Sequence, residues 1–185
     1  SAEELALLYQ MDADEFNRWD AGQRLATMVI WQSLQSLQQG QPPSEPTLLL
    51  ESFVAILRSG HSDLSFLSQL LTLPSEGYLS AQFQPISPNQ LREALWGLHD
   101  SLSNQLCKIW QQKYEEIGQP PAESLTAEAI GKRRFRNLCL SYLGRSQETI
   151  GEELAFQQFQ QSQSMTEAMG ALNRSEERFS RNAET

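Results

Sequence analysis

Residues 13–38, ADEFNRWDAGQRLATMVIWQSLQSLQ, decide how this chain folds. Their large apolar residues recur at steps of three, four and seven, which is the spacing of one face of an α-helix. A carboxylate at Asp12 or Asp14 can accept hydrogen bonds from the first turn, and Gly40 followed by two prolines ends the pattern. We expect a helix whose inward face consists of Phe16, Trp19, Ala26, Val29, Ile30, Leu34 and Leu37.

Other apolar residues of this stretch, namely Leu25, Met28 and Trp31, fall outside that face. A helix that is apolar over much of its circumference usually packs on more than one side. We therefore expect the chain to show surplus apolar surface, or to self-associate.

The same helical spacing continues to the end of the chain, and no stretch longer than four residues alternates as a strand would. Ser87 followed by Pro88 is a strong helix start, and we expect the helix that begins there to run unbroken to about Ile117. Leu125, Phe159 and the four tryptophans are expected in the core. The other expected helices cover 47–58, 62–71, 75–83, 124–143, 147–162 and 165–172, and the residues from Ser175 resemble the first turns of another.

These patterns predict an all-α protein in which paired antiparallel helices stack as an irregular solenoid. With 185 residues and 39% hydrophobic composition, the chain is expected to form one helical domain over 1–185. It begins without Met, so we expect a segment excised from a longer protein, and the cut-off appearance of residues 175–185 predicts that it is truncated at its C-terminus.

Charge and cysteine content restrict the partners and the compartment. The formal net charge is −9, and residues 1–90 hold ten acidic and three basic side chains, which disfavours nucleic acid as a partner. No apolar run approaches the roughly 20 residues that cross a bilayer, so no membrane partner is expected. Two cysteines, Cys107 and Cys139, fit no set of disulfides, which favours a reducing, cytoplasmic compartment and two buried thiols.

The sequence contains no recognisable catalytic motif. Hydrolytic zinc sites use H-E-x-x-H, but the only two histidines, His61 and His99, are followed by SDLS and DSLS. The cysteines lie 32 residues apart without a C-x-x-C motif, and no G-x-S-x-G motif marks a nucleophilic serine. We therefore expect no metal and no cofactor in this chain itself.

One run of basic residues is a candidate interaction patch, formed by Lys132, Arg133, Arg134 and Arg136 around Phe135. It can dock an acidic surface or an anionic ligand. The alternative is a solvated helix face that offsets nearby carboxylates such as Glu128, with Phe135 in the core.

Four segments together resemble bacterial aminopeptidase N, a zinc metallopeptidase of the gluzincin type. They occur in the family's order and cover nearly the whole chain: residues 16–23 (FNRWDAGQ), 71–76 (LTLPSE), 132–140 (KRRFRNLCL) and 165–172 (MTEAMGAL). In that family they belong to the C-terminal helical region, which follows the catalytic domain.

The resemblance implies an armadillo-like α-solenoid that covers the active-site cavity of an enzyme removing N-terminal amino acids from peptides. It implies zinc in the catalytic domain, held by H-E-x-x-H and a later Glu, and that domain as the partner within the same polypeptide. The family's catalytic motifs lie upstream of the matched segments. The resemblance therefore assigns no catalytic residue to this chain.

Two functions remain open from the sequence. The first is a non-catalytic segment that shapes and gates the cleft of a metalloaminopeptidase. The second is a stand-alone α-helical scaffold that binds a protein partner in a groove. An enzyme acting through this chain alone is the third class, and the absence of a recognisable site disfavours it.

Overall fold

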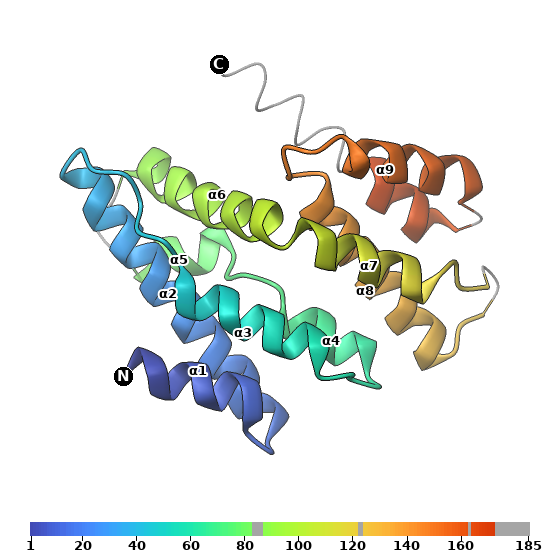
Figure 1. The fold of residues 1–185 in the computed structure, drawn as a ribbon, viewed down its shortest axis with the longest axis horizontal. Coiled ribbons are helices and arrows are strands. Elements are labelled where there is room, and N and C mark those ends of the chain that lie inside the picture. Colours follow the sequence, from blue (N-terminus) through green and yellow to red (C-terminus); the bar gives the residue numbers. More distant parts are fainter. Residues whose placement is uncertain (83–86, 122–123, 163, 173–185) are drawn as a thin grey trace. The chain divides into compact units, whose positions relative to one another are not determined.

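The computed structural model describes residues 1–82, 87–121, 124–162 and 164–172. All regular secondary structure within these ranges is helical, which confirms the all-α class (Figure 1). The helices are α1 (Ala2–Met11), α2 (Glu15–Gln38), α3 (Thr47–Arg58), α4 (Leu64–Leu70), α5 (Glu76–Gln82), α6 (Pro88–Gln105), α7 (Cys107–Ile117), α8 (Ala127–Leu143) and α9 (Ile150–Gln161), and a further helical run covers 165–172.

Contacts group the chain into two compact units. Unit 1 combines Ser1–His61 with Gln69–Ser101, and unit 2 combines Ser62–Ser68 with the chain from Leu102 onward. The single helical domain over 1–185 stays a prediction. The expected helix from Ser175 lies outside the described residues.

Helix α1 has no counterpart among the predicted helices, although its start carries a readable signal. The Ser1 hydroxyl accepts from the Glu4 backbone N–H at 3.2 Å, and the Glu4 carboxylate accepts from the Ser1 amino group at 2.6 Å. This reciprocal pair is a capping box, which satisfies donors that the first helical turn leaves free.

Tyr9 fixes α1 against the rest of unit 1. Its ring is buried, and its hydroxyl donates to the Leu70 carbonyl at 2.6 Å. A Cβ atom at Gly22 would lie 2.5 Å from Cε2 of Tyr9, so α2 approaches this ring only because position 22 has no side chain.

Helix α2 confirms most of the helix expected over 13–38. The Asp14 carboxylate caps its start by accepting from the Asn17 N–H at 2.9 Å. Leu25 is buried beside the predicted inner face, whereas Met28 and Trp31 are 37% and 40% exposed, so the described residues bury one broad side of α2. Two predicted inner residues are wrong: Phe16 is 69% exposed and Trp19 also reaches the surface. Both lie in the first turns of α2, ahead of Ala21, the first buried residue of this helix.

The expected unbroken helix over 88–117 is wrong, because Leu106 interrupts it between α6 and α7. Leu106 leaves the helical geometry with φ −106° and ψ 13°. The Leu102 carbonyl accepts from the Leu106 N–H at 3.2 Å and also from the Trp110 indole N–H at 3.3 Å. Apolar spacing does not encode such a side-chain bond to the helix backbone.

Helices α8 and α9 begin later than predicted. Thr126 caps α8 by accepting from the Ala129 N–H at 3.2 Å, which leaves Leu125 outside the helix and 81% exposed rather than buried. Phe159 of α9 is also exposed instead of buried, since it lies on the side away from Leu154.

The core of unit 2 is built around one stacked aromatic pair. Trp110 and Tyr142 are fully buried, with ring centroids 4.3 Å apart and planes 1° from parallel. Trp110 thereby confirms one of the four tryptophans expected in the core, whereas Trp19 and Trp31 are exposed and Trp96 is half-buried. Cys107 and Cys139 are buried and free, as predicted.

Candidate functional site

The basic run does not form one surface patch. Lys132 pairs with Glu128 at 2.7 Å, four residues earlier on the exposed side of α8. Arg134 is exposed, whereas Arg133 and Arg136 are buried. On a helix, four cations within five positions must point to several sides. The surface part of the run therefore consists of Lys132 and Arg134.

Arg133 holds the loop that leads into α8. Its guanidinium donates to the Pro121 carbonyl at 3.2 Å and to the Ser124 carbonyl at 2.8 Å. Backbone carbonyls outside regular structure need donors, and a planar guanidinium supplies two in one direction. Arg133 thus shapes the chain before the Thr126 cap.

Arg136 lies inside unit 2, against a tyrosine. Its Nη2 donates to the Tyr114 hydroxyl at 2.9 Å, and its guanidinium carbon lies 4.5 Å from the centre of the Tyr114 ring. Burial raises the pKa of the Tyr114 hydroxyl, although the Arg136 charge opposes that rise. Within the described residues, the Nε and Nη1 atoms of Arg136 and the Oε1 atom of Glu167 are buried without a hydrogen-bond partner.

Gln158 of α9 links this pair to the next elements of unit 2. Its Oε1 accepts from the Tyr114 hydroxyl at 3.0 Å. Its Nε2 donates to Asn137 Oδ1 and to the Glu167 carbonyl, each at 2.9 Å. One buried amide thereby joins α7, α8, α9 and the helical run over 165–172.

Two of the four segments that carry the aminopeptidase N resemblance meet at this point. Asn137, from segment 132–140, donates through Nδ2 to the carbonyl of Thr166, from segment 165–172, at 3.1 Å. A Cβ atom at Gly170 would lie 2.5 Å from the Asn137 amide carbon, so the two segments touch without an intervening side chain.

The other two segments meet in unit 1 through the same kind of bond. Gln23, from segment 16–23, donates through Nε2 to the carbonyl of Thr72, from segment 71–76, at 2.9 Å. In each unit a side-chain amide of one segment therefore anchors the backbone of the other. These residues hold helices together, a role that the sequence alone did not reveal.

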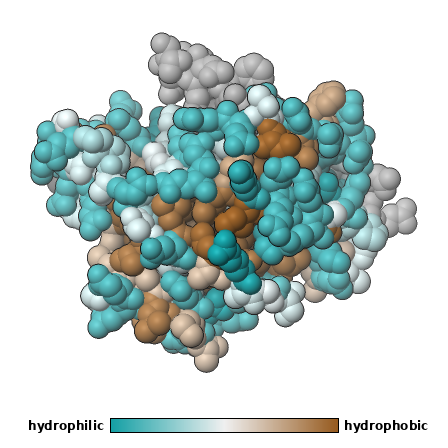
Figure 2. Space-filling model, viewed as in Figure 1, coloured by the Kyte–Doolittle hydropathy of each residue, from teal (hydrophilic) through white to brown (hydrophobic). Residues whose placement is uncertain are grey.

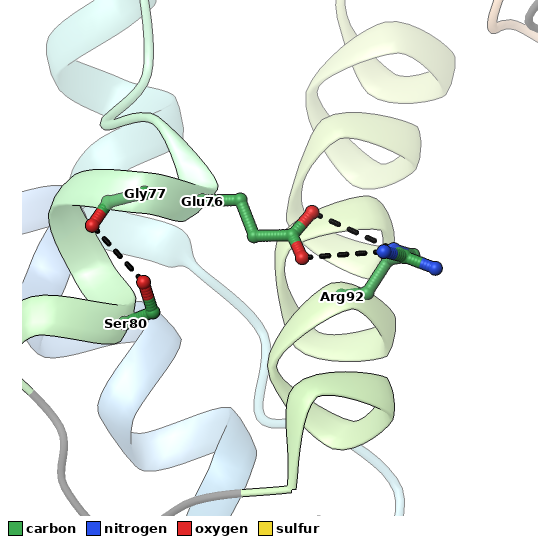
Figure 3. Close-up of polar contacts among 4 residues, drawn as sticks. All are labelled: Glu76, Gly77, Ser80 and Arg92. Atoms are coloured by element: carbon green, nitrogen blue, oxygen red, sulfur yellow. Dashed lines mark hydrogen bonds and ion pairs between the residues drawn. The ribbon is translucent and has the colours of Figure 1, made fainter.

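Segment 71–76 ends in a further link, from α5 to α6. The Glu76 carboxylate faces the Arg92 guanidinium at 3.3 Å and 3.5 Å (Figure 3). Both side chains are partly exposed, so the pair contributes only about 0.2–1 kcal/mol. Gly77 and Ser80, also drawn there, form a 3.0 Å bond within α5.

The two histidines do not form a metal site. The Nε2 atom of His61 lies 3.1 Å from the Nη2 atom of Arg18. Arg18 also donates through Nε to the Tyr9 carbonyl. Burial lowers the pKa of His61, and the Arg18 charge lowers it further against an opposing effect of Glu15. Among the described residues, no three His, Cys, Asp or Glu side chains gather as a metal ion would need.

A buried cysteine and a cavity in unit 1 are the remaining candidates for a functional site. Burial raises the pKa of the Cys139 thiol far above its usual range, which leaves it protonated and unreactive. A shallow cavity of ≈ 170 Å³ in unit 1 is formed by small and apolar residues with one carboxylate. Its lining consists of Val29, Ser33, Pro43, Ser44, Glu45, Pro46, Gly97, Leu98 and Ser101.

Comparison with known proteins identifies close counterparts of the chain in peptidases. It is 32% identical to Aminopeptidase N of Escherichia coli (strain K12) over 177 residues, which covers 94% of this chain and 20% of that protein. It is 26% identical to Aminopeptidase N of Haemophilus influenzae over 171 residues, covering 92% of this chain and 19% of that protein. The chain thus spans about a fifth of the length of these relatives.

A solved structure has the same fold. The crystal structure of Legionella pneumophila aminopeptidase A in complex with aspartic acid matches with a TM-score of 0.78 and 23% identity, over 93% of this chain and 21% of that chain. No helix in the described part combines the length and apolarity required to cross a bilayer.

A family model described as "Domain of unknown function (DUF3458_C) ARM repeats" matches residues 2–185. This match confirms the predicted helical solenoid, and the relatives confirm the predicted resemblance to aminopeptidase N. The chain therefore belongs to the DUF3458_C family of ARM repeats.

Proposed function

We propose that this chain is the non-catalytic helical segment of a zinc-dependent aminopeptidase that removes N-terminal amino acids from peptides. The observation that carries the proposal is the similarity to Aminopeptidase N over 94% of the chain. The hydrogen bonds of Gln23 and Asn137 support it, because they join the segments that carry the resemblance in pairs. These segments therefore serve to pack helices together.

Within such an enzyme, the segment helps to cover and gate the active-site cavity. Stacked helical repeats form extended, stiff surfaces suited to walling a chamber. Zinc then belongs to the catalytic domain, which is the partner within the same polypeptide, and peptides are the substrates. We place the enzyme in the cytoplasm, in keeping with two buried, free cysteines.

The basic run keeps its place as a predicted docking patch, restricted to Lys132 and Arg134. Because Glu128 already pairs with Lys132, Arg134 is the residue that an acidic surface or anionic ligand would engage first. Arg133 and Arg136 support this patch from beneath through their bonds to backbone and to Tyr114.

The alternative function is a stand-alone scaffold that binds a protein partner. The exposed apolar residues at the start of α2, Phe16 and Trp19, favour a partner of some kind under either function. The two functions differ in whether that partner is part of the same polypeptide.

The test compares the chain alone with the full polypeptide that contains it. Release of naphthylamine from alanyl-naphthylamide is measured in each, with and without a zinc chelator. We expect hydrolysis by the full polypeptide that the chelator abolishes, and none by the chain alone. Hydrolysis by the isolated chain, or an open reading frame that encodes this chain only, would contradict the proposal.

A further inference from the structure

Helix α1 carries more apolar surface than unit 1 buries. Its sequence, AEELALLYQM, is apolar on nearly every side after the first turn. Leu5, Ala6 and Tyr9 face the core, whereas Leu7, Leu8 and Met11 are exposed. A helix that is apolar all round is normally covered on all sides.

The exposed residues of α1 share one face, and two more exposed apolar residues follow at the start of α2. Leu7 and Leu8 lie four and three positions before Met11, so the three form one strip. Beyond the short turn at 12–14, Phe16 and Trp19 lie with ring centroids 5.9 Å apart. Figure 2 shows brown and tan apolar atoms at the surface where α1 lies in Figure 1. We name the set of Leu7, Leu8, Met11, Phe16 and Trp19 the N-terminal apolar face.

The surroundings of this face are acidic. Residues 1–20 hold six carboxylates and one arginine, and that arginine, Arg18, is bonded to Tyr9 and His61. Glu15 in particular is exposed beside Phe16. A second copy of the same face would bring these carboxylates against each other, which like-charge repulsion disfavours.

We propose that the N-terminal apolar face docks onto another domain of the same polypeptide, at an apolar surface bordered by lysine or arginine. The inference rests on the proposed function, which makes this chain one part of an aminopeptidase. Two observations choose the occupant: the acidic border calls for a basic counterpart, and about four-fifths of the relatives' length lies outside the matched region.

Unit 2 supplies a matched comparison for each key residue. Met11 and Met165 are 74% and 83% exposed, and Phe16 and Phe156 are 69% and 63% exposed. The unit 2 pair adjoins a different part of the chain and has no place in the proposed docking. The two pairs therefore compare exposed residues of the same types in the two units.

The experiment is hydroxyl-radical footprinting with mass spectrometry, on the isolated chain and on the full polypeptide at low micromolar concentration. We expect labelling of Met11 and Phe16 to fall at least fivefold in the full polypeptide. Unchanged labelling of Met11 and Phe16 in an active full polypeptide overturns the docking inference and leaves the proposed function intact. A full polypeptide without aminopeptidase activity overturns the proposed function instead.

A charge-reversal variant tests the basic border. Glu15→Lys in the full polypeptide is expected to restore at least half of the lost labelling at Met11, whereas Glu152→Lys, on α9, leaves it unchanged. Equal effects of both variants contradict the proposed border. Protection of Met11 in the isolated chain, together with a dimer in analytical ultracentrifugation, would make a second copy the occupant and overturn the inference.

Discussion

Gly170 lies so close to Asn137 that a Cβ atom added to it would come within 2.5 Å of the Asn137 amide carbon. The Asn137 amide cannot simply move away, because it donates to the Thr166 carbonyl and accepts from Gln158. The helical run over 165–172 is therefore held to α8 by a contact that admits no side chain at all.

Gly170→Ala is expected to lower the free energy of unfolding by about 1–2 kcal/mol, since crowding and lost bonds outweigh the better helix propensity of alanine. The matched control is Gly97→Ala, in α6, where an added Cβ atom meets nothing within 4 Å. That control should stabilise the protein by about 0.4–1 kcal/mol. Urea denaturation monitors both, and a Gly170→Ala protein as stable as the Gly97→Ala protein would contradict the close contact.

Gln158→Leu removes the amide that joins three partners inside unit 2. Each buried polar group left unpaired costs about 1–3 kcal/mol, so the total loss should reach at least about 2 kcal/mol. Gln157→Leu, at an exposed position of the same helix, should change stability by less than about 0.5 kcal/mol. Similar losses in both variants would mean that helix α9 is sensitive to leucine rather than to the missing bonds.

Arg133 and Arg134 are neighbours in sequence, but their replacement is expected to change stability by different amounts. Arg133→Met removes the guanidinium donor from the Pro121 and Ser124 carbonyls, of which Pro121 keeps the Ser124 N–H, and should cost about 1–2 kcal/mol. Arg134→Met should leave stability within about 0.5 kcal/mol of the parent and instead weaken any docking through the basic run. Thermal denaturation distinguishes them, and equal melting temperatures would refute the role assigned to Arg133.

His61 should make stability depend on pH. Because its pKa in the folded protein lies below the ordinary 6.5, the unfolded chain binds the proton more readily between these two values. The free energy of unfolding therefore rises with pH through this window, and the contribution is lost as pH falls below about 6.5. A His61→Asn variant should show a flatter profile from pH 5 to 7. Parallel profiles for the wild type and the variant would show that burial and the Arg18 charge do not lower the pKa of His61 in the folded protein.

Apolar spacing predicted the helices whose buried face and ends are determined by residues within or next to the helix itself. It located α2 and α3, since the Asp14 cap of α2 and the glycines that follow the two helices, Gly40 and Gly60, are close in sequence to the faces they bury. It failed at Leu106, the residue that interrupts the helix next to the Trp110 bond to Leu102 and the Trp110 stack on Tyr142 of another helix. Leu125 was misplaced because a threonine cap one residue later, and not apolarity, decides where α8 begins.

The candidate site was less predictable than the fold. Charge density singled out the run around Arg134, yet charge alone does not say which arginine turns inward to a carbonyl or to a tyrosine. Gln23 and Asn137 carried no such signal, because a single amide in a helix is most often solvated. Their importance follows only from which backbone each one reaches.

The contact between Tyr9 and Gly22 links the choices at two positions 13 residues apart. A larger residue at position 22 requires a smaller side chain at position 9. A smaller side chain at position 9 removes the hydroxyl that donates to the Leu70 carbonyl. Single replacements at either position therefore meet a penalty that only a paired replacement relieves. An alignment of homologous sequences should show these two positions varying together, in step with the backbone geometry at the end of α4.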